Sequence, residues 1–209
     1  MKYKYIFCAG APGSKWSSLI KNIYYSPDVD RSDYSDARTY YHDASGTMDL
    51  MHLGAYFDPG MEFDLSQQMN LESKDMLEEF FDSAFAPDGK GVRIVKSHVF
   101  CHQIPFLKQH WPDCPIVLVH RPNDACLGWW VKCGEFKITY PLYRDYYLDL
   151  RQMAQCIRKE NEGNRRGARE WPARAVETNL QLSRILGLAD PPTGYRQDYV
   201  ASDIKVTVI

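Results

Sequence analysis

The feature that most constrains the fold is a short apolar segment followed by a glycine turn and an amphipathic helix. The segment Lys4–Cys8 is rich in Tyr, Ile and Phe, which predicts a buried strand. A small-residue turn spans 9–14, and from about Lys15 the apolar residues recur on one helical face. A strand, a turn and a helix in this order favour an α/β protein.

The same alternation continues along the chain. Two further strands are predicted, Val92–Lys96 and Pro115–His120, and helices are predicted over 73–84, around Pro105–Gln109, and over 123–133, 142–162 and 173–187. Short apolar strands that alternate with helices favour a parallel sheet covered on both faces. We therefore predict a three-layer α/β/α fold with a central, mostly parallel sheet.

Length and composition limit the class of protein. A chain of 209 residues, 44% of them hydrophobic, is suited to one domain with a buried core. The longest aliphatic run, Ile116–Val119, is far shorter than the ~20 residues of a membrane helix, and the apolar stretch near the N-terminus is broken at Gly10. The net charge of −2 argues against a nucleic-acid partner. We expect a cytoplasmic protein with no membrane partner.

Charge is unevenly distributed. Residues 26–64 hold nine Asp or Glu against Arg31 and Arg38, within a Tyr-rich stretch of 26–70 that resembles a long excursion from the core. Residues 151–174 hold seven Lys or Arg against three Glu, which fits a solvated helix face or a surface that faces an anionic ligand.

The cysteines and histidines do not predict a metal site. Six cysteines are scattered without a CxxC pair, which is typical of reduced thiols. The stretch His98–His102 contains two histidines and Cys101, but no second ligand pair lies at a suitable spacing.

The glycine turn before the first helix has the form of a phosphate cradle. Backbone N–H groups and a helix N-terminus bind anions at such a turn. The Walker A pattern is absent, because Ser14 precedes Lys15 and Trp16 follows it. The later strands end in Lys96 and in His120-Arg121 rather than in an Asp that positions magnesium, which disfavours a metal-assisted NTPase or kinase.

Basic residues follow the second and third strands. Lys96 and His98 are two residues apart, and Arg121 ends the next strand. Ligands gather at the carboxyl ends of parallel strands, so we expect these residues and the turn after Cys8 to converge on one anion. Singly, Lys96 and Arg121 could be solvated strand ends, and His98 could be a structural histidine.

Three segments together resemble the PAPS-dependent sulfotransferases, whose sulfuryl donor is 3′-phosphoadenosine-5′-phosphosulfate (PAPS). The family's P-K-S-G-T-T-W loop is similar to the run Gly10-Ala11-Pro12-Gly13-Ser14-Lys15-Trp16, in which Ala11 stands in place of the family lysine. The K-T-H strand end resembles Lys96-Ser97-His98. The 3′-phosphate segment R-N-P-K-D-V-x-x-S resembles 121–130, one residue shorter and with Gly128 at the family serine.

The resemblance implies a P-loop-type fold like that of the nucleotide hydrolases, and transfer of a sulfuryl group from PAPS to an acceptor hydroxyl or amine, with PAP as product and no metal. It implies that His98 is the base and that Lys15 and Lys96 stabilise the leaving phosphate. Trp16 would stack on the adenine and Arg121 would hold the 3′-phosphate. The donor-binding residues are Gly10, Ala11, Pro12, Gly13, Ser14, Lys15, Trp16, Ser17, Arg121 and Gly128.

The stretch 26–70 is the candidate region for a small-molecule, carbohydrate or peptide acceptor. Arg165-Arg166-Gly167 resembles the family's late R-K-G motif. Two other functions stay open. One is a P-loop-like nucleotide or nucleoside kinase, and the other is a non-catalytic nucleotide-binding member of the family.

Overall fold

The computed structural model describes residues 2–35, 38, 53–65, 73–132, 147–195 and 200–209. The strands of this part are β1 (Tyr5–Gly10), β2 (Arg93–Lys96), β3 (Ile116–His120), β4 (Arg174–Val176) and β5 (Lys205–Val208). Its α-helices are α1 (Trp16–Tyr24), α2 (Lys74–Asp82), α3 (Ile104–His110), α4 (Asn123–Lys132), α6 (Leu150–Glu170) and α7 (Asn179–Ile185), and a 3₁₀ helix, η5, spans His98–His102.

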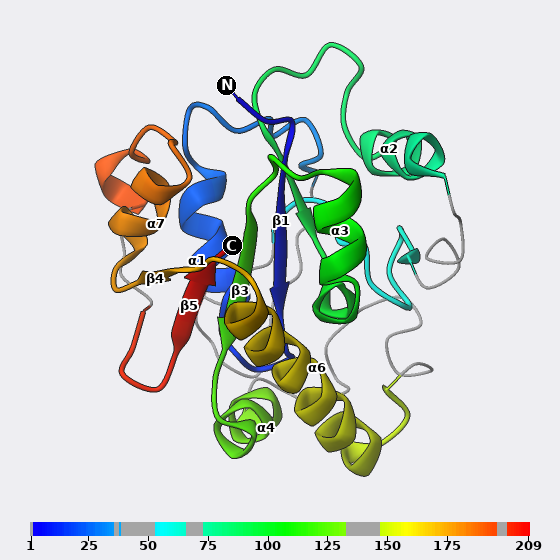
Figure 1. Cartoon of the computed structure of the whole chain (residues 1–209), viewed down its shortest axis with the longest axis vertical. Helices are drawn as coiled ribbons and strands as arrows, with labels where there is room; N and C mark the ends of the chain where they lie inside the picture. The colour runs from blue at the N-terminus through cyan, green and yellow to red at the C-terminus, as the bar shows by residue number, and fades with distance from the viewer. Residues whose placement is uncertain (1, 36–37, 39–52, 66–72, 133–146, 196–199) are drawn as a thin grey trace.

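The five strands form one open sheet in the order β2-β1-β3-β5-β4 (Figure 1). β1 pairs in parallel with β2 and with β3, so the C-terminal ends of these three strands lie at one edge of the sheet. β5 runs antiparallel to both β3 and β4. The edge that carries the three parallel strand ends is also the edge from which α1 and α4 begin.

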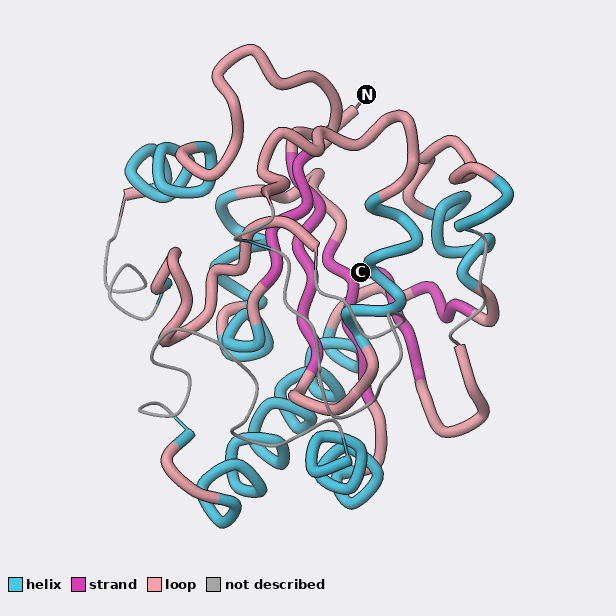
Figure 2. Tube along the Cα trace, turned by 180° about the vertical axis from the view of Figure 1, so that it is seen from behind, coloured by secondary structure: helices cyan, strands magenta, loops and turns pink. Residues whose placement is uncertain are grey.

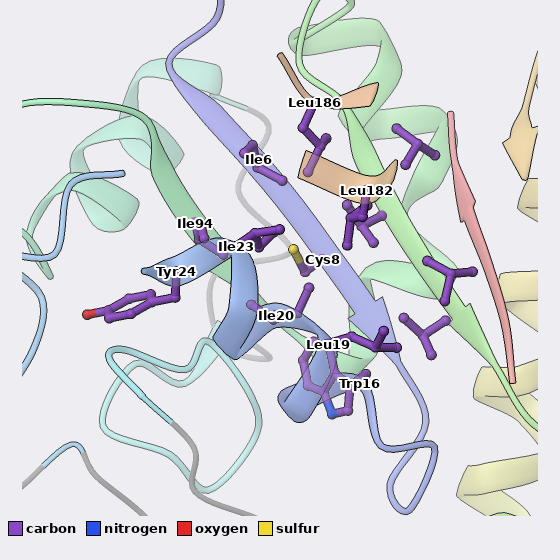
Figure 3. Packing of buried hydrophobic residues seen from close by; sticks show 14 of the residues in the cluster. Ile6, Cys8, Trp16, Leu19, Ile20, Ile23, Tyr24, Ile94, Leu182 and Leu186 are labelled. Carbon is purple, nitrogen blue, oxygen red and sulfur yellow. The ribbon is translucent and has the colours of Figure 1, made fainter. Parts of the chain in front are cut away.

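β1 and β3 are buried on both faces because helices cover the sheet on each side. Along β1, Ile6 and Cys8 pack into a core with α1 and α7, as the close view in Figure 3 shows. Tyr5 and Phe7 pack into a second core with α2, α3 and η5. The strands therefore lie between helical layers (Figure 2), and the predicted three-layer α/β/α architecture is present.

Helix α6 lies very close to η5 and to the start of α3 at two glycines. A Cβ atom at Gly163 would be 2.6 Å from the carbonyl oxygen of Cys101 in η5. A Cβ atom at Gly167 would be 2.2 Å from Ile104 Cδ1. These glycines let the long helix cross directly over η5 and the start of α3.

The C-terminal half differs most from the predicted elements. The helix predicted over 173–187 is wrong at its start, because Arg174–Val176 forms β4 and α7 begins only after Thr178, whose side chain accepts a hydrogen bond from Gln181 N. Strand β5 was not predicted, so the antiparallel part of the sheet is an addition to the parallel one. None of the helices in the described part of the chain has the length and apolar character needed to cross a membrane.

The helix predicted over 142–162 is confirmed over 150–162 but begins later and extends further than predicted. Residues 142–146 lie outside the described residues, and α6 begins at Leu150, where Asp149 accepts a hydrogen bond from Gln152 N. Leu148 just before it has a left-handed φ of 54°. The helix extends to Glu170 and includes Gly163 and Gly167, which lower helix propensity but allow the close approach to η5 and Ile104.

Replacing Gly163 by Ala will destabilise the protein, because the new methyl group meets a backbone carbonyl that cannot move away. We expect a loss of about 1–3 kcal/mol in the free energy of unfolding, measured by urea denaturation. Gly128→Ala in α4 is the matched control, since nothing lies within 4 Å of a Cβ atom there. That control should gain about 0.5–1 kcal/mol. Equal effects of the two substitutions would contradict the close approach of α6.

Candidate functional site

The turn between β1 and α1 is held tightly against α4. Ser14 N donates a hydrogen bond of 3.0 Å to Ala11 O, which closes the turn. Gly13 has a φ of +76°, and a Cβ atom there would be 1.9 Å from the carbonyl oxygen of Cys126. Only glycine satisfies both conditions. The turn is thus a fixed backbone loop rather than a surface excursion.

The first turn of α1 has the charge distribution of an anion-binding terminus. Lys15, at the N-cap, has a left-handed φ of 64°, its side chain does not cap the helix, and no acidic residue lies in the first turn. The N-terminal end of a helix carries partial positive charge. Beside it, the Ser14 hydroxyl is fully buried and has no hydrogen-bond partner among the described residues. A buried hydroxyl without a partner is uncommon, and it leaves one donor at the turn that the described part of the chain does not satisfy.

Three cationic side chains surround the indole ring of Trp129 in α4. Lys15 Nζ lies 4.1 Å from the ring centroid, Lys132 Nζ 5.4 Å, and the guanidinium carbon of Arg121 5.9 Å. They come from the start of α1, the end of α4 and the end of β3. The edge of the sheet beside the glycine turn is therefore strongly basic, with an aromatic ring at its centre.

Arg121 joins this cluster to the turn. Its Nη1 donates to Gly13 O at 3.2 Å, and its Nε donates to Asp203 Oδ2 at 2.7 Å. The predicted convergence of Arg121 with the turn after β1 is therefore present. Gly128 lies in the middle of α4, and no atom is within 4 Å of the position that a Cβ atom would take there.

His98 is buried beneath the turn, with polar partners at both ring nitrogens. Nδ1 is hydrogen-bonded to Gly10 O, and since a carbonyl only accepts, Nδ1 carries a proton. Nε2 faces Asp58 Oδ2 at 3.6 Å, which is too long for a hydrogen bond. The nitrogen left to accept a proton is therefore Nε2.

Asp58 orients this histidine and was not predicted from the sequence. Its Oδ1 accepts hydrogen bonds from Ser97 Oγ at 2.8 Å and from His98 N at 2.5 Å. Burial raises the pKa of the Asp58 carboxyl, although His98 and the bond from Ser97 act to lower it. A carboxylate in this position stabilises a second proton on the imidazole ring. Asp58 lies inside the acidic stretch expected to bind an acceptor, so no local motif distinguished it.

We expected Lys96 to point to the glycine turn, but its side chain points elsewhere. Its Nζ donates to Leu53 O and lies 4.6 Å from the ring centroid of Tyr56 and 5.5 Å from that of Tyr24. Burial lowers the pKa of Lys96 to about 8, against the opposing charge of Asp33. In this arrangement Lys96 holds the segment around Leu53 against α1.

Trp16 is a packing residue in this structure. The ring is only 2% exposed, lies 4.8 Å from the His98 ring centroid and meets the Tyr56 ring edge-on at 5.5 Å. Its faces are covered, which corrects the expectation that it stacks on an adenine. Ser17, the next residue, is hydrogen-bonded through its hydroxyl to Tyr56 at 3.1 Å. His98 and Lys96 do lie on the same α1-facing side of the sheet, joined through Trp16 and Tyr56.

The described part of the acidic stretch is tied to the core rather than exposed. Asp33 is fully buried and accepts from Tyr24 OH and from Ala55 N, both at 2.7 Å. Asp30 pairs with Arg93 at 3.1 Å. Residues 36–37, 39–52 and 66–70 of the predicted acceptor region lie outside the described residues.

Another buried acid, Glu160, lies on α6 and was also missed. Burial and then the charge of Asp58 raise its pKa well above the ordinary value. In the sequence, Glu160 falls in a charged helical run, where a solvated position is the usual expectation. Among the described residues, no group of three or more His, Cys, Asp or Glu side chains is placed to hold a metal ion.

Comparison with protein-family models, with curated proteins and with solved structures found no match to this chain.

The buried Lys96 makes stability depend on pH in the alkaline range. Its pKa is about 8 in the folded chain and returns to the ordinary 10.5 on unfolding, so between these values the unfolded chain binds more protons. Stability therefore rises with pH across this window, by roughly 3 kcal/mol in total.

We expect the free energy of unfolding of the wild type to rise relative to that of Lys96→Met between pH 8 and pH 10.5. Urea denaturation at several pH values measures the difference. The effect of tyrosine titration on the free energy of unfolding cancels from this difference, because both proteins contain the same tyrosines. Lys90→Met, which removes an exposed lysine, controls for the loss of one charge. A difference that stays constant with pH would show that Lys96 is not buried as described.

Proposed function

We propose that this chain transfers a sulfuryl group from PAPS to an acceptor hydroxyl or amine. The observation that carries the proposal is the basic cluster of Lys15, Arg121 and Lys132 around Trp129, beside a glycine turn that leads into a helix. A donor whose ribose carries phosphate groups at its 5′ and 3′ positions needs cations for their charge and an aromatic surface for its base. We also propose that the sheet and this turn are of the P-loop type.

The residues of the turn fit the 5′-phosphosulfate. The N-terminus of α1 and the Ser14 hydroxyl supply donors to its oxygens, and Lys15 adds a positive charge at the same end. In the transfer, the acceptor oxygen or nitrogen forms a bond to sulfur while the bond from sulfur to the 5′-phosphate oxygen breaks. Negative charge grows on that leaving oxygen, so Lys15 and the helix terminus stabilise the transition state more than the bound donor.

Arg121 and Trp129 fit the other end of the donor. Arg121 is anchored by Asp203 and Gly13, which fixes the direction of its guanidinium group. Its remaining N–H donors would hold the 3′-phosphate. Trp129 takes the stacking role that the buried Trp16 does not have.

His98 would take the acceptor proton at Nε2. The bond from Nδ1 to Gly10 O fixes the ring, and the Asp58 carboxylate stabilises the imidazolium that forms. Asp58 is a positioning residue in this scheme, because it acts through the histidine. Lys96 supports the Leu53–Asp58 segment that carries it.

We predict that PAP stabilises the protein without a metal ion. At 100 times its dissociation constant it should add about 2.7 kcal/mol of stability in a thermal-shift assay, unchanged by EDTA. Arg121→Ala should weaken PAP binding about 10- to 100-fold but leave adenosine 5′-phosphosulfate, which lacks the 3′-phosphate, nearly unchanged. Damage to the fold would weaken both ligands alike. Stabilisation by ATP with magnesium, lost on chelation, would favour a kinase instead.

A second prediction uses the open space at Gly128, where the resembling family has a serine that binds the 3′-phosphate. Gly128→Ser should tighten PAP binding by up to about tenfold, because a hydroxyl placed beside the phosphate adds one charge-assisted hydrogen bond. Gly128→Ala, which adds a methyl group only, should leave the affinity unchanged in calorimetric titration. If Ser and Ala behave alike, the 3′-phosphate does not lie beside α4.

A further inference from the structure

A basic cavity lies on the opposite side of β3 from the glycine turn. It has a volume of about 210 Å³ between β3, β5 and α6, and its polar lining residues are His120, Asn164, Arg165, Arg169, Lys205 and Thr207. We call it the α6–β5 cavity. Figure 1 shows α6 crossing the sheet over β3, beside β5.

The geometry of β3 separates this cavity from the proposed donor site. Successive side chains of a strand point to opposite faces. Arg121 reaches Gly13 on the α1 side. His120, the residue before it, lines the cavity on the α6 side and is the register partner of Lys205 across the β3–β5 pair.

The cavity has an excess of positive charge. Arg165 and Arg169 share a single carboxylate, Glu162, at 2.7 and 3.4 Å. Within the described part of the chain, Lys205 forms no ion pair. Arg165 and Lys205 lie close enough to His120 that, after burial, they lower its pKa. Three cations facing one carboxylate leave a net charge that an anion would balance.

A buried amide, that of Asn164, limits which anions the cavity can bind. Asn164 is 1% exposed, and its Nδ2 donates to Val119 O at 3.3 Å, which fixes the orientation of the amide. Its Oδ1 then has no hydrogen-bond partner among the described residues. An oxygen that can only accept is satisfied by a donor, and a ligand that carries a proton supplies one. Hydrogen phosphate has such a proton, and sulfate at neutral pH does not.

We propose that the α6–β5 cavity binds hydrogen phosphate, either as the inorganic ion or as the phosphate group of a small monoester. The cationic side chains bind the charged oxygens, and Asn164 Oδ1 accepts a hydrogen bond from the ligand. A cavity of about 210 Å³ is smaller than the ~300–1,000 Å³ of sites for drug-sized ligands, so a nucleotide does not fit. The site does not depend on the proposed sulfuryl transfer.

Calorimetric titration of the full chain at fixed ionic strength tests the proposal, with inorganic phosphate, glycerol 3-phosphate and sulfate as the three probes. We expect one saturable site for phosphate or the monoester and at least about tenfold weaker binding of sulfate. Lys205→Ala and Arg165→Ala should each weaken phosphate binding at least about fivefold. Arg158→Ala, on the exposed face of α6 away from the cavity, should have no effect.

Asn164→Ala should reduce the preference for phosphate over sulfate. If this variant fails to fold, Lys205→Ala and Arg165→Ala still decide the outcome. Phosphate binding that is insensitive to Lys205 and Arg165 would overturn the proposal, as would the absence of a saturable signal up to about 10 mM. Repeating the titration with saturating PAP separates the two sites. If PAP does not bind, the sulfuryl-transfer proposal fails while the variants of the cavity still test this one.

Discussion

The buried imidazole of His98 joins three parts of the chain at one point. Nδ1 is bonded to the last carbonyl of β1, Nε2 faces Asp58, and the ring packs against Trp16 at the start of α1. Each partner belongs to a different segment, so the position of the glycine turn relative to the end of β2 depends on this residue. A histidine is suited to this role because it has two polar edges on a flat apolar ring.

The parallel half of the fold could be predicted from the sequence because its signals are local. An apolar strand, a glycine turn and a one-face helix identify β1 and α1, and the helix predicted over 73–84 is α2, with Ser73 as its N-cap. Strand β5 and its partner β4 could not be predicted in this way. They are only four and three residues long, and their pairing is decided by contacts with distant parts of the chain.

The residues of the candidate site also fall into two groups, those that the sequence predicts and those that it does not. The turn and Arg121 were found because strand ends converge in a parallel sheet, a rule that needs no contact information. The directions of Lys96 and Trp16 were wrong because a side chain at the end of a strand or the start of a helix can point into the core as easily as toward a ligand. Asp58 was missed because an aspartate among many others in an acidic stretch carries no distinguishing pattern, although burial makes it the partner of His98.

The antiparallel pairing of β5 has a consequence for the order in which the sheet assembles. Val117 of β3 pairs with Val208, and β4 is joined to the rest of the sheet through β5. During synthesis, β1, β2 and β3 can associate while later residues are still being added. The strand β4 has its place only once residues 205–208 have left the ribosome, since contacts between distant segments form late. The nascent chain therefore presents the β3 edge uncovered for the time needed to translate nearly half of the protein.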